Sequence, residues 1–109
     1  FNIKSTDIID GAECSLEQVF TCRAIRNFQL LVKRFGTNDG AALTRTIHLE
    51  NPDLIIITNE IGSGIIPIEK SDRIWREETG RACCTAAGFS DLVVRMCCGI
   101  PTAIKGELP

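Results

Sequence analysis

The segment at residues 53–58, DLIIIT, whose core is an unbroken apolar run, restricts the fold more than any other feature. A short run of β-branched residues that follows a proline is typical of a β-strand. Because the centre of this run carries no polar side chain, we expect it to be covered on both faces, as central strands of parallel sheets are. The sequence therefore favours a parallel sheet with flanking helices.

Other strand and helix patterns alternate with this run along the chain. Further strands are predicted at Thr6–Asp10, at Ser90–Cys98 and, as a last edge strand, at Thr102–Lys105. Helices are predicted at Ala41–Leu49 and at Ile68–Gly88. Such alternation is typical of βαβ crossovers, so we predict one α/β domain over residues 1–109 with a mostly parallel sheet.

A further long helix is predicted after the strand at residues 6–10. Ser15 is its expected N-cap, and Gln18 three residues later completes a capping box. Apolar residues near helical spacing extend the helix to Phe35, and Gly36 is its expected C-cap. In the helix at residues 68–88, Ser71 is the candidate cap.

Charge and hydropathy argue against two classes of partner. The net charge is −2, so there is no basic field to hold nucleic acid. The longest apolar runs, at residues 54–57 and 65–66, are far too short to span a membrane. With no secretory signal in view, we expect a cytoplasmic protein with no nucleic-acid or membrane partner.

Six cysteines are present: Cys14, Cys22, Cys83, Cys84, Cys97 and Cys98. No C-x-x-C spacing occurs and His48 is the only histidine, which argues against a zinc site. We interpret the cysteines as free thiols that act as small buried hydrophobes. A thiol-based redox or metal-binding function is the alternative.

Polar residues follow two of the predicted strands, at the end of the sheet where ligands bind in open α/β folds. Asp10 ends the first strand, and Asn59 and Glu60 follow the strand at residues 53–58. A carboxylate here can hold the Mg²⁺ of a nucleoside triphosphate, because Mg²⁺ prefers hard oxygen ligands. The alternative is that Asp10 only caps a turn or the next helix. We expect these strands to be neighbours or near neighbours, so that the three residues border one cleft.

Three arginines on the helix at residues 68–88 are candidates for contact with phosphate or a neighbouring subunit. They are Arg73, Arg76 and Arg81, of which the first two share a helix face. The alternative is a solvated basic face. No G-x-x-x-x-G-K-[ST] pattern occurs, and His48 lies far from any nucleophile motif, so we assign no catalytic residue.

The stretch from Thr58 to Arg81, TNEIGSGIIPIEKSDRIWREETGR, resembles the bifunctional adenosylcobinamide kinase / adenosylcobinamide-phosphate guanylyltransferase family. That family has a strand ending in (S/T)-N-E-(V/I)-G-x-G-(I/V)-(I/V)-P, then a helix with two arginines and a G-R pair. The matching residues are Asn59, Glu60, Gly62, Gly64, Pro67, Arg73, Arg76, Gly80 and Arg81. The closing SDLVVRMCCGIPTAIKG is also similar to the end of the family, and DIIDGAECS matches its start more loosely.

The resemblance implies a P-loop type α/β fold, a homotrimer and two activities in cobalamin assembly. These are phosphorylation of adenosylcobinamide by ATP or GTP with Mg²⁺, and transfer of GMP from GTP through a guanylylated histidine. Asp10 matches the family's nucleotide-site acid. The family's phosphate-binding loop and histidine lie N-terminal to the matched segment, so we expect Phe1 to begin part-way through a longer product. We expect the 109 residues alone to be inactive.

Two departures from the family pattern indicate a diverged branch. Cys83 and Cys84 replace a polar pair, and the first helix lacks the usual tryptophan-bearing opening. The chain is therefore either the C-terminal portion of a cobinamide kinase / guanylyltransferase, or a catalytically silent relative that binds nucleotide or acts as an assembly subunit.

A homo-oligomer is expected, and the resemblance implies that it is a trimer. Ile61, Ile65 and Ile66 lie in a glycine-bearing loop, and Trp75 lies between arginines on the following helix. Apolar groups beside an aromatic residue and arginines are typical of an interface core with a polar rim. The alternative is that these isoleucines fold back onto their own domain.

Overall fold

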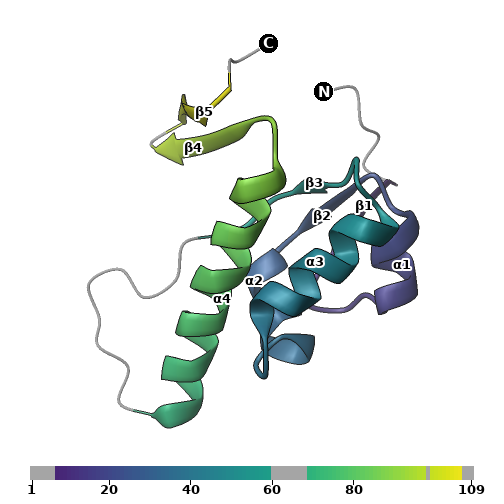
Figure 1. The fold of residues 1–109 in the computed structure, drawn as a ribbon, viewed down its shortest axis with the longest axis vertical. Helices are drawn as coiled ribbons and strands as arrows, with labels where there is room; N and C mark the ends of the chain where they lie inside the picture. Colours follow the sequence, from purple (N-terminus) through teal and green to yellow (C-terminus); the bar gives the residue numbers. More distant parts are fainter. Residues whose placement is uncertain (1–6, 60–68, 98, 107–109) are drawn as a thin grey trace.

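The computed structural model describes residues 7–59, 69–97 and 99–106. The elements within these ranges are, in order, β1 (Ile8–Asp10), α1 (Leu16–Thr21), β2 (Ala24–Arg26), α2 (Phe28–Phe35), α3 (Gly40–Glu50), β3 (Ile55–Ile56), α4 (Lys70–Phe89), β4 (Val93–Cys97) and β5 (Ile100–Lys105). Figure 1 shows α4 along one side of the first three strands, with β4 and β5 beyond its C-terminal end. The expected α/β class is confirmed. No helix in the described ranges has the length and apolar character needed to cross a membrane.

The strands β1, β2 and β3 form a parallel sheet with β2 in the middle. Ile9 lies opposite Ile25, and Ile25 lies opposite Ile56, so one row of isoleucines crosses the sheet. Ile25 is fully buried, whereas its two partners on the outer strands are only partly buried. Among the described residues β2 is the central strand, and the DLIIIT run forms the outer strand β3. The prediction that this run is a central strand is therefore wrong for the described sheet.

The prediction of one helix from Ser15 to Phe35 is wrong in its middle. The helix starts as expected: Ser15 Oγ accepts a hydrogen bond from Gln18 N at 3.3 Å, and Gln18 Oε1 accepts one from Ser15 N at 3.0 Å. The helix ends at Thr21. Residues 24–26 then form the strand β2, and a second helix, α2, begins at Phe28. Pairing on both sides with β1 and β3 outweighs the local helical pattern of these residues.

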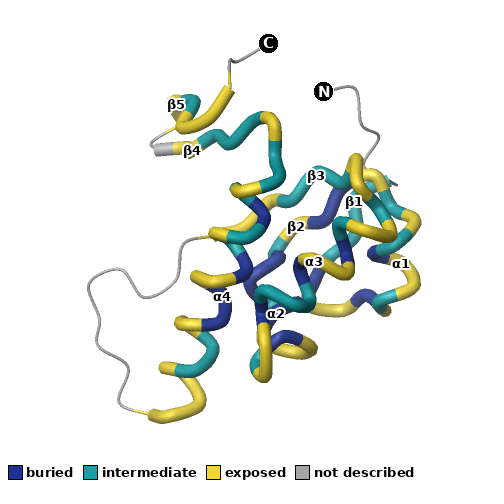
Figure 2. Tube along the Cα trace, in the orientation of Figure 1, coloured by how far each residue is buried: buried dark blue, intermediate teal, exposed yellow. Residues whose placement is uncertain are grey.

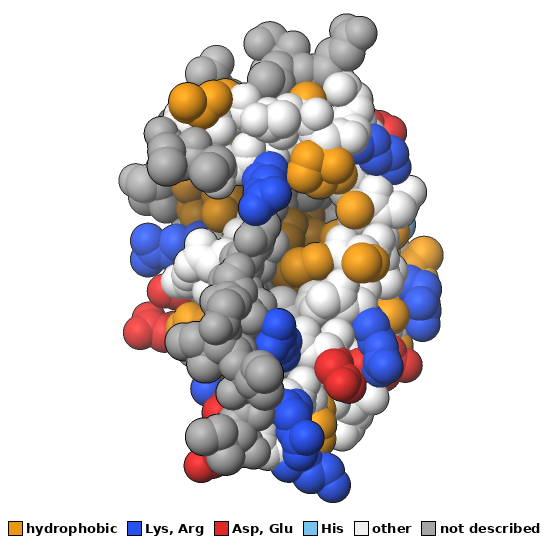
Figure 3. All heavy atoms as spheres, turned by 90° about the vertical axis from the view of Figure 1, so that its left-hand side faces the viewer, with side chains coloured by type: hydrophobic (Ala, Val, Ile, Leu, Met, Phe, Trp, Pro, Cys, Tyr) orange, Lys and Arg blue, Asp and Glu red, His pale blue; other side chains and the backbone are white. Residues whose placement is uncertain are grey.

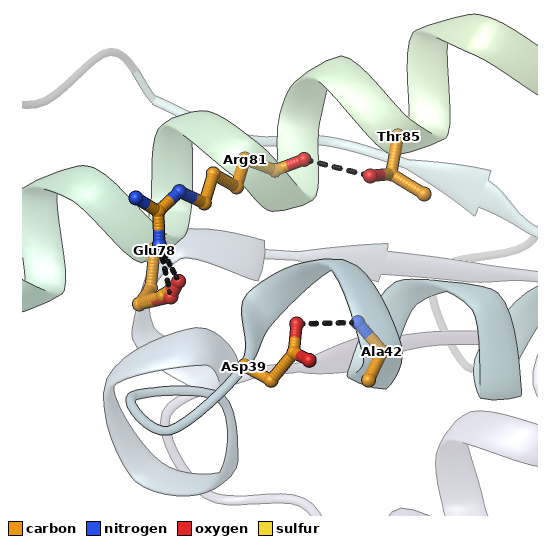
Figure 4. Close-up of polar contacts among 5 residues, drawn as sticks. All are labelled: Asp39, Ala42, Glu78, Arg81 and Thr85. Carbon is orange, nitrogen blue, oxygen red and sulfur yellow. Dashed lines mark hydrogen bonds and ion pairs between the residues drawn. The ribbon is translucent and has the colours of Figure 1, made fainter.

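The helices α3 and α4 agree with the prediction and pack closely together. Asp39 caps α3, because its Oδ1 accepts a hydrogen bond from Ala42 N at 3.0 Å (Figure 4). A Cβ atom on Gly40 would overlap the carbonyl oxygen of Glu78 in α4, so the close approach of the two helices requires glycine. The proposed cap Ser71 is wrong, because α4 begins earlier and places this serine inside its first turn.

The predicted strands at residues 90–98 and 102–105 are present, but they do not extend the parallel sheet. They pair with each other as the antiparallel strands β4 and β5. Only residues 98 and 99 separate them, and so short a connection cannot support a parallel crossover. Lys105 Nζ ties this hairpin to α4 by donating hydrogen bonds to the carbonyl oxygens of Ala87 (2.9 Å) and Gly88 (3.1 Å).

The core lies where β2, α2, α3 and α4 meet, as the buried segments in Figure 2 show. Its largest fully buried side chains include Phe28 and Leu31 of α2, Ile25 of β2 and Ile47 of α3. Burial of each such side chain contributes about 1.5–3 kcal/mol. Because buried residues flank the junction of β2 and α2, they fix the position of Asn27, which lies between them.

Candidate functional site

The carboxyl ends of β1, β2 and β3 lie at one edge of the sheet, as parallel pairing requires. Asp10 ends β1, Asn27 follows β2, and Asn59 lies beyond β3. The strands that carry Asp10 and Asn59 are near neighbours, since each pairs with β2, which separates them. They are thus the two outer strands of the described sheet. Glu60 lies outside the described residues, so a cleft bordered by all three residues stays a prediction.

Asp10 is oriented and kept ionised by its surroundings. Its Oδ1 accepts hydrogen bonds from Ala12 N at 2.9 Å and from Asn27 Nδ2 at 3.1 Å. These two bonds, the first contributing most, hold the pKa of the carboxyl below its usual value against a smaller effect of desolvation. The Ala12 bond closes a local turn, which agrees with the turn-cap alternative. The Asn27 bond reaches across to the next strand and is not explained by a turn.

The second carboxylate oxygen of Asp10 is the one that a cation could reach. Oδ2 lies 3.6 Å from Nη2 of Arg26, whose side chain is largely exposed. Such an exposed ion pair is weak and can be exchanged for another cation. Within the described residues no group of three acidic, histidine or cysteine ligands could hold a metal by itself. A single carboxylate still fits Mg²⁺, which keeps several waters and binds largely through substrate phosphates.

Asn27 and Gln29 form a polar chain that connects Asp10 with the end of β3. The Nε2 of Gln29 donates to Asn27 Oδ1 at 3.5 Å, and its Oε1 accepts hydrogen bonds from Asn59 N at 3.1 Å and Thr58 Oγ1 at 3.4 Å. Gln29 is only 5% exposed, so both ends of its amide need such partners. The three strand ends are therefore linked by side chains and not only by the sheet.

The turn after β1 is fixed against β2 by its backbone. Gly11 N donates to the carbonyl oxygen of Arg26 at 2.8 Å, and a Cβ atom at Gly11 would lie 2.5 Å from the carbonyl oxygen of Asn27. Glycine is thus required for the turn to pass this close. Arg34 of α2 adds a hydrogen bond from Nη1 to the carbonyl oxygen of Gly11 at 2.9 Å. The turn that follows Asp10 is therefore held in place by β2 and by α2.

Trp75 anchors the first half of α4 beside this polar chain. Its Nε1 donates to the carbonyl oxygen of Gln29 at 2.7 Å, and Lys33 Nζ lies 4.6 Å from the centroid of its ring. The indole therefore has partners inside the domain, and because its ring is only half-buried, its expected place in a subunit interface stays a prediction. The other residues of that expected interface, Ile61, Ile65 and Ile66, lie outside the described residues.

The three candidate arginines lie along α4 with exposed side chains. Figure 3, which views the molecule from the α4 side, shows Lys and Arg side chains over the lower half, where the first half of α4 lies in Figure 1. Arg81 has a structural partner, because its Nη1 lies 2.9 Å from Oε1 of the buried Glu78 (Figure 4). Arg73 and Arg76 flank Trp75 and stay candidates for phosphate or a partner.

The described cysteines differ in their surroundings. Cys14 is buried, Cys22 and Cys83 are partly buried and Cys84 is exposed, so the prediction of small buried hydrophobes holds for the first and fails for the last. Burial raises the pKa of the Cys14, Cys22 and Cys83 thiols. The ring of His48 stacks on that of Phe89 at 3.8 Å between centroids, which gives it a packing role.

Asn27 and Gln29 are the site residues that the sequence analysis missed. Both fell inside the predicted continuous helix, where polar residues are expected to face solvent. The available signal was an asparagine two residues after the short apolar pair Ala24-Ile25, since asparagine is favoured at helix starts and disfavoured inside helices.

Comparison with protein families gives one match that spans most of the chain. A family described as cobinamide kinase / cobinamide phosphate guanyltransferase matches residues 8–104. No curated protein sequence matches the chain significantly.

Proposed function

Because the chain belongs to the cobinamide kinase / cobinamide phosphate guanyltransferase family, whose broad role is in cobalamin biosynthesis, we propose that it supplies one edge of that family's nucleotide site. The edge consists of the residues that follow β1, β2 and β3, with Asp10 as its acid. The observation that carries the proposal is the orientation of Asp10. Its hydrogen bonds are made by Oδ1, while Oδ2 has, among the described residues, an exposed arginine as its neighbour.

Asp10 acts in this proposal as an oxygen ligand for the Mg²⁺ of bound ATP or GTP, directly or through water. The ion would supply charge stabilisation for phosphoryl or nucleotidyl transfer to cobinamide. In this proposal Asn59, which follows β3, contributes to the same site, and Glu60 is included because it comes next in the sequence. Arg73 and Arg76, which are exposed on the first half of α4, would contact phosphate or a partner subunit in this proposal. The pKa of Asp10 is lowered, so the free carboxyl is fully ionised at neutral pH.

Phosphorylation of adenosylcobinamide by the full-length protein tests this proposal. Asp10→Asn removes the charge at the proposed site, whereas Asp53→Asn removes an exposed charge just before β3, at the opposite edge of the sheet. We expect Asp10→Asn to lower kcat/KM by about 100-fold, as loss of an electrostatic contact to a transferring group does. Asp53→Asn should match the wild type. Equal activity of both variants contradicts the proposal, and a folded wild type without activity favours the silent relative.

A homo-oligomer, most simply a trimer, is part of the proposal, and cytoplasmic location goes with it. Support comes from the hairpin of β4 and β5, where Met96, Ile100 and Ile104 are each more than 60% exposed. The register places Ile100 and Ile104 on one face of the hairpin and Met96 on the other. Exposed apolar side chains of this size are typical of a surface that meets a partner. Light scattering coupled to size-exclusion chromatography tests it, and a monomer at micromolar concentration contradicts it.

A further inference from the structure

We propose that Asn27 is a positioning residue that holds the Asp10 carboxylate in the orientation used by the nucleotide site. The inference rests on the proposed function, because it concerns how Asp10 meets its ligand. In this role Asn27 does not touch the ligand and acts only through Asp10.

The backbone of Asn27 has an unusual conformation. Its φ of 54° and ψ of 43° lie in the left-handed region, and among the described residues no other non-glycine residue has a positive φ. Asparagine tolerates this region better than most residues, but such a conformation persists only where its surroundings enforce it. Here Phe28 enforces it, because its side chain is fully buried and its N–H donates to the carbonyl oxygen of Ile57 at 3.1 Å.

The side chain of Asn27 is not used in the way its position suggests. The residue occupies the N-cap of α2, where asparagine normally accepts a hydrogen bond from the first turn, yet it makes no capping bond. Its Nδ2 instead donates to Asp10 Oδ1 at 3.1 Å, across 17 residues of sequence. The start of α2 therefore has no side-chain cap, and the Asp10 carboxylate at the end of β1 accepts an additional hydrogen bond.

Gln29 determines which way the Asn27 amide faces. The Gln29 Nε2 donor points to Asn27 Oδ1, so the Asn27 Nδ2 donor must face Asp10. The opposite end of the Gln29 amide is occupied by the Asn59 N–H at 3.1 Å, which fixes its own orientation. The direction of the hydrogen bonds therefore runs from Asn59 to Asp10, and reversal of either amide would place two acceptors against each other.

Titration calorimetry on the full-length protein, with GTP in excess Mg²⁺ and with GTP in EDTA, tests the inference. Asn27→Gly keeps the left-handed backbone accessible and removes only the amide. We expect its Kd with Mg²⁺ to rise about tenfold, as for other residues that orient a metal ligand, and its Kd in EDTA to stay at the wild-type value. In an Asp10→Asn background, the same change should add no further loss, because Asn27 acts through Asp10.

Asn51→Ala is the matched control. Asn51 Nδ2 donates to the carbonyl oxygens of Val19 (2.9 Å) and Cys22 (2.7 Å), and Asn51 precedes β3 at the opposite edge of the sheet. Its loss should lower the free energy of unfolding without a change in Mg²⁺ dependence.

Three results would overturn the inference. If Asn27→Gly binds like the wild type while Asp10→Asn is weakened, Asn27 has no positioning role and the proposed function stands. If Asn27→Gly weakens binding equally with and without Mg²⁺, its role is structural. If the wild type binds GTP equally well in Mg²⁺ and in EDTA, the proposed role of Asp10 fails, and that of Asn27 fails with it.

Discussion

Replacement of Gly40 by alanine should destabilise the protein, although alanine is the better helix former. Gly40 opens α3, and a Cβ atom there would overlap the carbonyl oxygen of Glu78 while lying 3.3 Å from the Cβ of Ala82. The main obstacle is backbone, so relief requires α3 and α4 to move apart. Overpacking of this kind costs about 1–3 kcal/mol. The gain in helix propensity is at most about 1 kcal/mol. We expect a net loss of stability of about 1 kcal/mol, the middle of the first range less that gain.

Gly80→Ala is the control for this prediction. Gly80 lies in the middle of α4, and a Cβ atom added to it would have no neighbour within 4 Å in the described part of the chain, so alanine has room there. We expect Gly80→Ala to raise the free energy of unfolding by about 0.5–1 kcal/mol. Urea denaturation followed by circular dichroism measures both variants. If Gly40→Ala is as stable as Gly80→Ala, then α3 and α4 do not approach each other as described.

Three further predictions concern single side chains. Thr79→Val should raise the free energy of unfolding by about 1 kcal/mol, because the Thr79 hydroxyl is buried without a hydrogen-bond partner among the described residues. Chemical denaturation measures the change, and a loss of stability contradicts the prediction. Iodoacetamide should modify Cys84 before Cys83, since Cys83 is partly buried and its pKa is raised by desolvation. Fragment-ion mass spectrometry of the peptide that holds both residues gives the order, and preferential labelling of Cys83 contradicts the prediction. The stability that the Asp10 carboxylate contributes should be complete above its unfolded-state pKa, near 3.8, and be lost as the pH falls through its lower folded-state pKa. Acid unfolding of the wild type and of Asp10→Asn tests this, and parallel pH profiles of the two proteins contradict it.

The alternation of strands and helices could be predicted because each long element carries its own signal. The DLIIIT run has too many β-branched residues for a short helix, and the polar segment before α3 contains Asp39, a good cap. The element β2 carried no such signal, because Ala24-Ile25-Arg26 contains one β-branched residue and lies between two segments with a helical pattern.

The missed segment nevertheless carries a physical clue to its structure. The apolar residues at 16–20 and those at 28–32 each form a helical stripe. At about 100° per residue, however, the two stripes are about 120° apart around a single axis, so one straight helix could not bury both. Two helices separated by a strand can do so, as α1, β2 and α2 do. Asn27 and Gln29 were not predicted as site residues because β2 was not predicted. Their role depends on which strand lies in the middle of the sheet.

The central claim is that nucleotide binds at the carboxyl edge of the three-stranded sheet. Side-chain amide signals in a ¹⁵N NMR titration of the full-length protein with Mg²⁺ and GTP test it most directly. Asn27 and Gln29 report on this edge, and Asn51 reports on the opposite one. We predict that the first two signals shift with the nucleotide and that the Asn51 signal does not. Shifts confined to Asn51, or no shift of Asn27 and Gln29 at saturating nucleotide, would contradict the account.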